Sequence, residues 1–453
     1  MPIFLSIIDL ALNNLAGNME YTEFQTRLRD SLNEAGRQIS ESVLAELERQ
    51  IKADPTRRQG WHICRAGDEK SMLTGFGTVR YRRTYYVNPT SGERAYLVDR
   101  QVGYGAHQRV DANVKAAVVA KAADLSYRKS GERLEGSPAE VAVSGQTVMN
   151  ALRGFTVPAG AKRQEPQRRV STLYIEADED HVAGQNGRNM EARLVYVHEG
   201  WQGINRRRLQ NACYISSVGE DTAAFWERVW EEVARRYEMD TIETVYLMGD
   251  GAAWIRAGLD VFVGAEFILD QFHIKKALTK LAAGDRARLS RLKQSIHDDN
   301  LAALYVVVNE LLERATSRNR IQTIQQTWIY LSNHWDGILA AEKAAARQVG
   351  CSGEGHVSHI LSARLSSRPM GWTQSGARRM AEIRTCRANG RNVGQEYLNQ
   401  QSLPLPVLSL RPEVLAVERK QLGVLREQLE NVPVLRGPRN FLFDALKGLS
   451  FPA

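Results

Sequence analysis

Residues 245–255, V-Y-L-M-G-D-G-A-A-W-I, and residues 267–276, F-I-L-D-Q-F-H-I-K-K, decide the fold. Each begins with a short run of β-branched, aromatic and apolar residues, which predicts a buried strand. The first strand ends at Asp250 and the second at Asp270. Because ligands bind beyond the carboxyl ends of strands in open α/β sheets, both carboxylates are predicted at one functional edge.

Aspartate is also common in turns and as a helix cap, so either residue alone is better explained as structural. The second strand end adds His273 three residues after Asp270, and Lys275 and Lys276 then open a predicted helix. Two strand-end carboxylates with a histidine and basic residues beside them favour a site.

The composition of the 453 residues, 43% hydrophobic and 25% charged, is that of a globular protein with two or three domains. The net charge of +8 is compatible with a polyanionic partner, but it is a weak signal alone. Four scattered cysteines suggest neither a zinc knuckle nor a disulfide framework, and reduced thiols in the cytoplasm are the simplest account. No segment approaches the ~20 apolar residues of a membrane span.

Residues 3–52 are predicted as two helices, and residues 72–98 as a β-hairpin with its turn at 88–92. Arg80 and Arg82 lie on one face of the hairpin and interleave with tyrosines, which suits binding to a nucleic-acid backbone. An ordinary charged outer face of a half-buried hairpin explains the pattern equally well.

Residues 111–155 are predicted as three short helices, the last capped by Ser144 and packed inward through Val148 and Leu152. This pattern suits a helix-turn-helix, although any small helical bundle would show it. In the first interpretation, four side chains of the last helix face a major groove: Gln146, Thr147, Asn150 and Arg153.

After a linker at 156–170, the predicted order is three antiparallel strands, a helix, a strand, a helix and a strand. That is the order of the ribonuclease-H-like fold. Its first and fourth strands are neighbours, so Asp178, or its rivals Glu176 and Asp180, would meet Asp250. Buried carboxylates at that range repel each other unless a cation lies between them. Oxygen ligands suit Mg²⁺ or Mn²⁺, and two such ions serve in-line phosphodiester reactions.

The pattern is helical from 273 to 350, and Glu354 then begins a polar helix with His356, His359 and Arg364. Glutamate in a first helical turn is favoured by the helix dipole alone, so a purely structural capping role for Glu354 is the alternative. Two histidines without a cysteine partner make zinc an unfavoured interpretation. A last helix at 413–429 and a basic tail at 433–453 complete the chain.

Seven motifs together resemble one family, the ISLre-type insertion-sequence transposases, bacterial DDE enzymes once catalogued as an uncharacterised protein family. In order they are G-T-V-R-Y-R-R-T-Y-Y, L-S-Y-R-K-S, L-Y-I-E-A-D-E-D-H-V, G-D-G-A-A-W-I, L-D-Q-F-H-I-K-K, E-G-H-V-S-H-I-L-S-A-R and R-P-M-G-W-T-Q-S-G-A-R-R-M. They run from about Phe76 to Arg384. The D-x-x-H of Asp270 and His273 also resembles a signature of Mutator-like transposases.

The resemblance implies a catalytic, metal-binding triad of Asp178, Asp250 and Glu354, with Glu382 as a rival to the third acid. It implies supporting roles near the scissile phosphate for Asp270 and His273, with Asp180 and His356 as further candidates. DNA contacts are expected at Lys275, Lys276, Arg364, and the hairpin and helix-turn-helix residues named above. The implied partners are transposon ends, target DNA and at least one further copy of the chain, without a membrane or a small-molecule cofactor. The implied location is the cytoplasm of a bacterium, on the nucleoid.

The expected architecture is therefore α/β, a ribonuclease-H-like core with an all-helical insertion, preceded by a helical region, a β-hairpin and a helix-turn-helix-like region. Alternatives are a ribonuclease-H-like nuclease without strand transfer, and a DNA-binding regulator whose acids are structural. The predicted boundaries, in chain order, are 1–60, 61–110, 111–155, the linker 156–170, 171–273, the insertion 274–350, 351–400 and 401–453.

Overall fold

The computed structural model divides the chain into two compact units. The first comprises Met1–Ser42, Ser71–Arg80 and Arg109–Gln401, and the second Val43–Lys70, Tyr81–Gln108 and Ser402–Ala453. The structure describes residues 2–132, 134, 136–138, 141–157, 166–202, 208–346, 351, 353–368 and 370–401. The predicted last helix at 413–429, the basic tail and most of the predicted linker lie outside these residues.

The predicted N-terminal helices are confirmed as α1 (Pro2–Leu15) and α2 (Tyr21–Ala53), and a short α3 (Pro55–Gly60) follows. The predicted hairpin is confirmed as β2 (Gly77–Val87) and β3 (Arg94–Tyr96). An unpredicted strand, β1 (His62–Thr74), pairs with β2, and a short α4 (Leu97–Gln101) follows the hairpin. Because most of β1 is exposed and polar, its sequence lacks the alternation that marks a strand.

The alternation of β2 shifts in the second half of the strand. Val79 and Tyr81 are buried, but the buried positions then continue at Thr84 and Tyr86. A buried carboxylate, Asp99, accepts hydrogen bonds from the Tyr81 hydroxyl and from Lys70 and Arg83. Arg83, which alternates with Tyr81 along the strand, is therefore paired with a buried acid.

The three predicted short helices are α5 (Ala112–Ala122), α6 (Tyr127–Ser130) and α7 (Gly145–Arg153). The Ser144 hydroxyl accepts a hydrogen bond from the Thr147 N–H, so the predicted cap is confirmed. Val148 and Leu152 are buried, also as predicted. The late helix α19 (Val393–Gln401) packs on α5.

A five-stranded sheet forms the centre of the first unit, in the order β10-β9-β4-β5-β8. Strand β4 pairs antiparallel with β5 on one side and parallel with β9 on the other, so the predicted neighbours are confirmed. The strands are β4 (Thr172–Ala183), β5 (Asn189–His198), β8 (Cys213–Val218), β9 (Thr244–Gly249) and β10 (Glu266–Leu269). A separate two-stranded sheet pairs β6 (Trp201–Gln202) with β7 (Arg208–Leu209).

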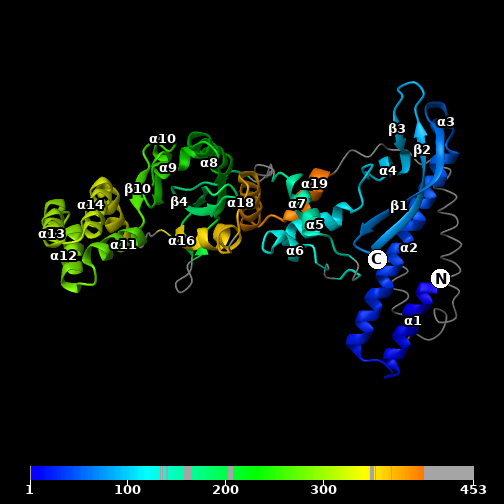
Figure 1. Ribbon diagram of the computed structural model, residues 1–453, viewed down its shortest axis with the longest axis horizontal. Helices are drawn as coiled ribbons and strands as arrows, with labels where there is room; N and C mark the ends of the chain where they lie inside the picture. Colours follow the sequence, from blue (N-terminus) through cyan, green and yellow to red (C-terminus); the bar gives the residue numbers. More distant parts are fainter. Residues whose placement is uncertain are drawn as a thin grey trace. The chain divides into compact units, whose positions relative to one another are not determined.

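Helices cover both faces of this sheet with their apolar sides. On one face, the buried residues of β4 pack with Phe225, Trp226 and Val229 of α8 (Thr222–Arg236), as its amphipathic pattern predicts. On the other face lies α18 (Gln374–Ala388), which packs beside β8 (Figure 1). The short elements of this unit are η1 (Met239–Thr241), α9 (Ala253–Arg256), α10 (Gly258–Val261), α16 (Gly353–Val357), the π-helical turn η2 (Ser358–Ser362) and α17 (Ala363–Leu365).

Five helices follow β10 and form one block, which confirms the predicted helical segment as far as residue 346 (Figure 1). They are α11 (Gln271–Ala282), α12 (Arg286–His297), α13 (Leu301–Arg314), α14 (Arg318–Asn333) and α15 (Trp335–Ala346). Their buried apolar residues are continuous with the core of the sheet, and α15 packs against β10. Among the described residues, no helix is long and apolar enough to cross a bilayer.

Candidate active site at the sheet edge

Three neighbouring strands each present an aspartate at the same level of the sheet. Glu176 of β4 lies opposite Met248 of β9, and Asp178 and Asp250 each follow two residues later. Leu269 of β10 lies opposite Gly249, and the Asp270 N–H donates to the Gly249 carbonyl oxygen over 2.8 Å. Parallel pairing therefore brings Asp178, Asp250 and Asp270 to one edge, as the strand-end pattern predicts.

Asp178 lies in an unfavourable electrostatic environment. The pKa of its carboxyl is raised to about 7, chiefly by burial and also by the negative charge of Asp250, against the lowering effects of the Glu179 N–H and of His273. Two carboxylates that disfavour each other's charge at this range are the arrangement that a bound cation relieves.

The turn that carries Asp250 is held tightly on several sides. The Asp250 Oδ1 accepts a hydrogen bond from the Ala252 N–H over 2.8 Å. Gly251 has a φ of +90°, a conformation that side-chain-bearing residues rarely adopt. A Cβ on Gly249 would lie 2.7 Å from the Ala177 carbonyl oxygen, so β9 approaches β4 too closely for any other residue there.

Tyr330 of α14 and His334, the C-cap residue of that helix, contact this turn, and the sequence interpretation missed both. The Tyr330 hydroxyl donates to the Asp250 carbonyl oxygen over 2.8 Å. His334 Nε2 lies 2.7 Å from the point where a Cβ on Gly251 would be. Their i, i+4 spacing on one helix face is the only sequence signal for the pair, and it is common.

Asp270 and His273 are three residues apart at the start of α11 and form an ion pair. The His273 Nδ1 lies 3.0 Å from Asp270 Oδ2, and this hydrogen bond raises the pKa of the imidazole, with further contributions from Asp250 and Asp178. Asp270 also caps α11 by accepting from the Phe272 N–H. The structural and the functional explanations of Asp270 are therefore compatible, because the residue that caps α11 also holds the His273 imidazole near the acids.

The predicted third acid lies on a helix that begins against the first. A Cβ on Gly353 would lie 3.3 Å from the Cβ of Asp178, so residue 354 follows directly on the contact with β4. The Glu354 side chain itself lies outside the part of the chain that the structure describes. The rival Glu382 has Arg379, Arg228 and Glu220 as its charged neighbours, and α18 packs on β8, two strands away from β4.

The other candidate acids have structural partners. Glu176 is fully buried and accepts from the Tyr196 hydroxyl, and Asp180 accepts from the Ser366 hydroxyl. The His356 ring packs against Tyr196 at a tilt of 37°, with ring centroids 4.6 Å apart, and its Nδ1 lies 3.1 Å from the Tyr214 hydroxyl oxygen. On the opposite face of β4, Glu179 accepts from the Trp254 indole N–H over 2.6 Å, a contact that sequence patterning did not suggest.

The donor set at the edge fits a hard divalent cation. Asp178 and Asp250 supply carboxylate oxygens in register, and their mutual repulsion is what such an ion would relieve. Among the described side chains, no group of three or more His, Cys, Asp or Glu residues is placed to hold a metal ion. A complete site therefore depends on the third acid.

Most of the predicted DNA-contacting residues are exposed. The exposed set comprises Arg80, Arg82, Gln146, Asn150, Arg153, Lys275 and Lys276, and Thr147 is half-buried. Arg364 differs, because it is buried, donates to the Ala122 carbonyl oxygen and lies over the Tyr127 and Trp372 rings. These contacts leave its guanidinium little surface for a phosphate, and we assign it to packing.

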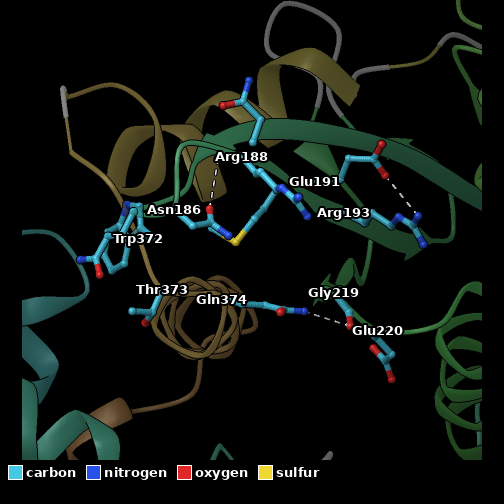
Figure 2. A pocket seen from close by; sticks show the side chains of 12 residues that line it. Asn186, Arg188, Glu191, Arg193, Gly219, Glu220, Trp372, Thr373 and Gln374 are labelled. Carbon is cyan, nitrogen blue, oxygen red and sulfur yellow. Dashed lines mark hydrogen bonds and ion pairs between the residues drawn. The ribbon is translucent and has the colours of Figure 1, made fainter.

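A separate cavity of about 590 Å³ lies at the turn between β4 and β5, beside the start of α18 (Figure 2). Its lining is polar and includes Arg188, Asn186 and Gln374, whose amide donates to the Gly219 carbonyl oxygen. The aspartates of the sheet edge are not among its lining residues. The candidate chemistry and this cavity are therefore distinct features.

Comparisons with known proteins identify relatives along nearly the whole chain. One UPF0236 protein of Caldanaerobacter subterraneus subsp. tengcongensis is 32% identical over 450 residues, covering 98% of this chain and 96% of that protein. A second from the same organism is also 32% identical, covers 96% of this chain and 93% of its own, and has a name that joins eleven locus designations. A UPF0236 protein of Streptococcus gallolyticus is 22% identical over 382 residues, covering 82% and 83% of the two chains.

Among solved structures, the Drosophila P element transposase strand transfer complex matches at 9% identity with a TM-score of 0.23, covering 74% of this chain and 88% of that one. A likeness at this level decides nothing about the fold. The sequence comparisons do decide the family, because its profile matches residues 14–402. The chain therefore belongs to the uncharacterised protein family UPF0236.

Proposed function

We propose that this protein is a DNA transposase of the DDE type, which cuts the ends of a mobile DNA segment and joins them to target DNA. The observation that carries the proposal is the alignment of Asp178 and Asp250 on neighbouring parallel strands, with the helix that bears Glu354 beginning against Asp178. Asp178, Asp250 and Gly353 come from distant parts of the chain, and nothing in their local sequence requires these approaches.

The strand order supports the proposal. Three antiparallel strands followed by two parallel ones, with the first strand central, is the arrangement of ribonuclease-H-like enzymes. In this interpretation the helices α11–α15 are an insertion between the second and third acids. Strand β4 then carries the first acid and β9 the second, at the sheet edge where such folds bind their ligands.

The name of one relative adds independent support. It joins eleven locus designations within a single organism, which indicates one protein encoded at many places in a genome. Mobile DNA produces such copies, whereas a regulator or a housekeeping nuclease is ordinarily encoded once.

The proposed chemistry has two in-line steps at phosphorus. In the first, a water oxygen bonds to the phosphorus at the end of the mobile segment, and the 3′-oxygen leaves and takes up a proton. In the second, that 3′-hydroxyl loses its proton and bonds to a phosphorus of the target, whose own 3′-oxygen departs and is protonated. No covalent bond between protein and DNA is needed in either step.

Asp178, Asp250 and Glu354 would hold one or two Mg²⁺ or Mn²⁺ ions, which supply charge stabilisation at the attacking and leaving oxygens. Asp270 orients His273, whose imidazole, when protonated, is suited to a phosphate oxygen. Lys275 and Lys276 are exposed one turn further along α11 and would contact flanking phosphates.

DNA recognition is proposed on α7, where Gln146, Asn150 and Arg153 are exposed. The hairpin arginines Arg80 and Arg82 would contact the phosphate backbone. Pairing two ends of a mobile segment requires two active sites, so we propose a homodimer or a larger assembly on DNA.

The test is cleavage of an end-containing DNA by Asp178→Asn and Asp250→Asn proteins, with Asp260→Asn as the control. Asp260 is an exposed aspartate on α10, away from the three-strand edge. We expect the first two changes to lower cleavage at least about a thousandfold while DNA binding is kept, and the control to leave both unchanged.

Cleavage that survives both changes would exclude the proposal. A protein that cleaves but never joins its 3′-ends to a target plasmid would be a nuclease of the same fold class. Specific DNA binding with no dependence on a divalent cation would identify a regulator instead.

A further inference from the structure

The helical block contributes polar side chains to the acid-bearing edge, although its helices carry none of the three proposed catalytic acids. Tyr330, in the last turn of α14, and His334, which caps that helix, both contact the Asp250–Ala252 turn. Their rings contact each other edge to face, with centroids 5.0 Å apart. The pair therefore acts on the turn as one unit.

The Tyr330 hydroxyl is a permanent donor in this position. Burial raises the pKa of the phenol, and the negative charges of Asp250 and Asp270 raise it further. Its proton is directed at the Asp250 carbonyl oxygen, which has no strand partner at this point because β9 ends at Gly249. A phenylalanine would keep the ring and lose only this hydrogen bond.

His334 acts on the turn by shape. Burial and the positive charge of Arg256 lower the pKa of its imidazole. Its Nε2 occupies the place that a side chain at position 251 would need. The ring thereby closes over the glycine and limits how far the Asp250 turn can move.

The same contacts are not needed to attach the block to the sheet. Helix α15 packs directly against β10, and the apolar core runs without a break from the sheet into α11–α14. Two half-buried polar residues add little to an interface of that kind. Both side chains instead contact the backbone of the turn that carries Asp250.

We propose that Tyr330 and His334 are positioning residues that fix the Asp250 turn, so that the helical block sets the affinity of the acidic edge for a divalent cation. This inference rests on the proposed function, because it takes Asp178 and Asp250 as cation ligands. Residues that orient a metal ligand commonly change metal affinity ten- to a hundredfold when they are replaced.

The test is Mn²⁺ binding to the full chain without DNA, measured by calorimetry and by electron paramagnetic resonance of the free ion. We expect Tyr330→Phe to weaken Mn²⁺ binding about tenfold, while thermal unfolding of the metal-free protein stays within about 2 °C of the wild type. The matched control is Tyr305→Phe, which removes a hydroxyl from an exposed tyrosine on α13 of the same block.

His334 provides a second variant pair with a built-in rescue. His334→Ala is expected to weaken Mn²⁺ binding severalfold, and His334→Phe to restore most of it, because the contact depends on the shape of the ring. Unchanged binding in both Tyr330→Phe and His334→Ala would overturn the inference alone, provided that Asp250→Asn still abolishes binding. A wild-type protein that binds no Mn²⁺ would overturn the inference and the proposed metal site together.

Discussion

Glu176 and Asp178 lie two residues apart on β4 and point to the same face of the sheet, yet their surroundings are opposite. Glu176 is fully buried and satisfied by the Tyr196 hydroxyl at 2.6 Å and by His198 Nε2 at 3.0 Å. On the other side of the ring, His198 Nδ1 lies 3.1 Å from the Gly200 nitrogen and 3.2 Å from its carbonyl oxygen. Within the described part of the chain, the one hydrogen bond that Asp178 accepts comes from the N–H of Glu179, and Asp250 adds its negative charge.

The difference separates a carboxylate that stabilises the fold from one that is available for a ligand. A buried carboxylate with several donors is stabilised by its own protein. A buried carboxylate beside another carboxylate keeps an unfavourable energy that a cation would remove. Judged by burial alone, Glu176 would be the stronger candidate for a ligand-binding carboxylate. Judged by the hydrogen bonds that each carboxylate accepts, the stronger candidate is Asp178.

The largest effect on stability is expected from Glu176→Ala. This change leaves the Tyr196 hydroxyl and the His198 ring without their buried acceptor, so the free energy of unfolding should fall by about 3–5 kcal/mol. Urea denaturation measures it, and Glu191→Ala on the exposed side of β5 is the control, with an expected change below about 1 kcal/mol. Equal losses in the two variants would break the comparison.

A smaller effect of opposite sign is expected from Asp178→Asn in metal-free buffer. The pKa of the Asp178 carboxyl, about 7 in the folded protein, lies above its unfolded value. Its contribution to wild-type stability therefore falls as pH rises from about 4 to 7. Asparagine does not ionise, so the variant should be more stable than the wild type by roughly 1–3 kcal/mol at pH 8 and nearly equal to it at pH 4. Unfolding curves in chelator at both pH values measure this, and a variant that is less stable at pH 8 would contradict it.

The smallest effect is expected from His273→Gln, which tests the positive charge beside Asp178. The pKa of His273 is raised in the folded protein, chiefly by Asp270, so its stabilising contribution is present below the unfolded value and is lost as pH rises through the folded one. The variant should lose about 1 kcal/mol of stability at pH 5.5 and much less at pH 9. A loss of the same size at both pH values would show that the ring only packs.

The sequence predicts the sheet well because its strands alternate cleanly or end at glycine and aspartate. The β4 run Leu173, Ile175, Ala177 has a period of two, and the register that follows from it places Asp178 level with Asp250. Helix boundaries followed equally from capping residues such as Ser144. These signals depend only on residues that are close in the chain, so they can be recognised in the sequence.

The contacts that complete the site are not local. Tyr330 reaches Asp250 across 80 positions of the chain, and Gly353 reaches Asp178 across 175, so no periodicity reports either contact. Arg364 shows the converse error, because an arginine in a polar helix suggests a phosphate contact until its burial between two rings is known. Which polar residues face a site is a property of tertiary packing.

The two glycines that flank Asp250 have a consequence for comparing this chain with its relatives. Gly249 is required by the closeness of β4, and Gly251 by its positive φ and by the His334 ring. A relative with alanine at either position would retain every acid and still carry the second one on a displaced loop. Under the proposed function, intact carboxylates are therefore an insufficient criterion for an active protein, and the tripeptide G-D-G is the better one.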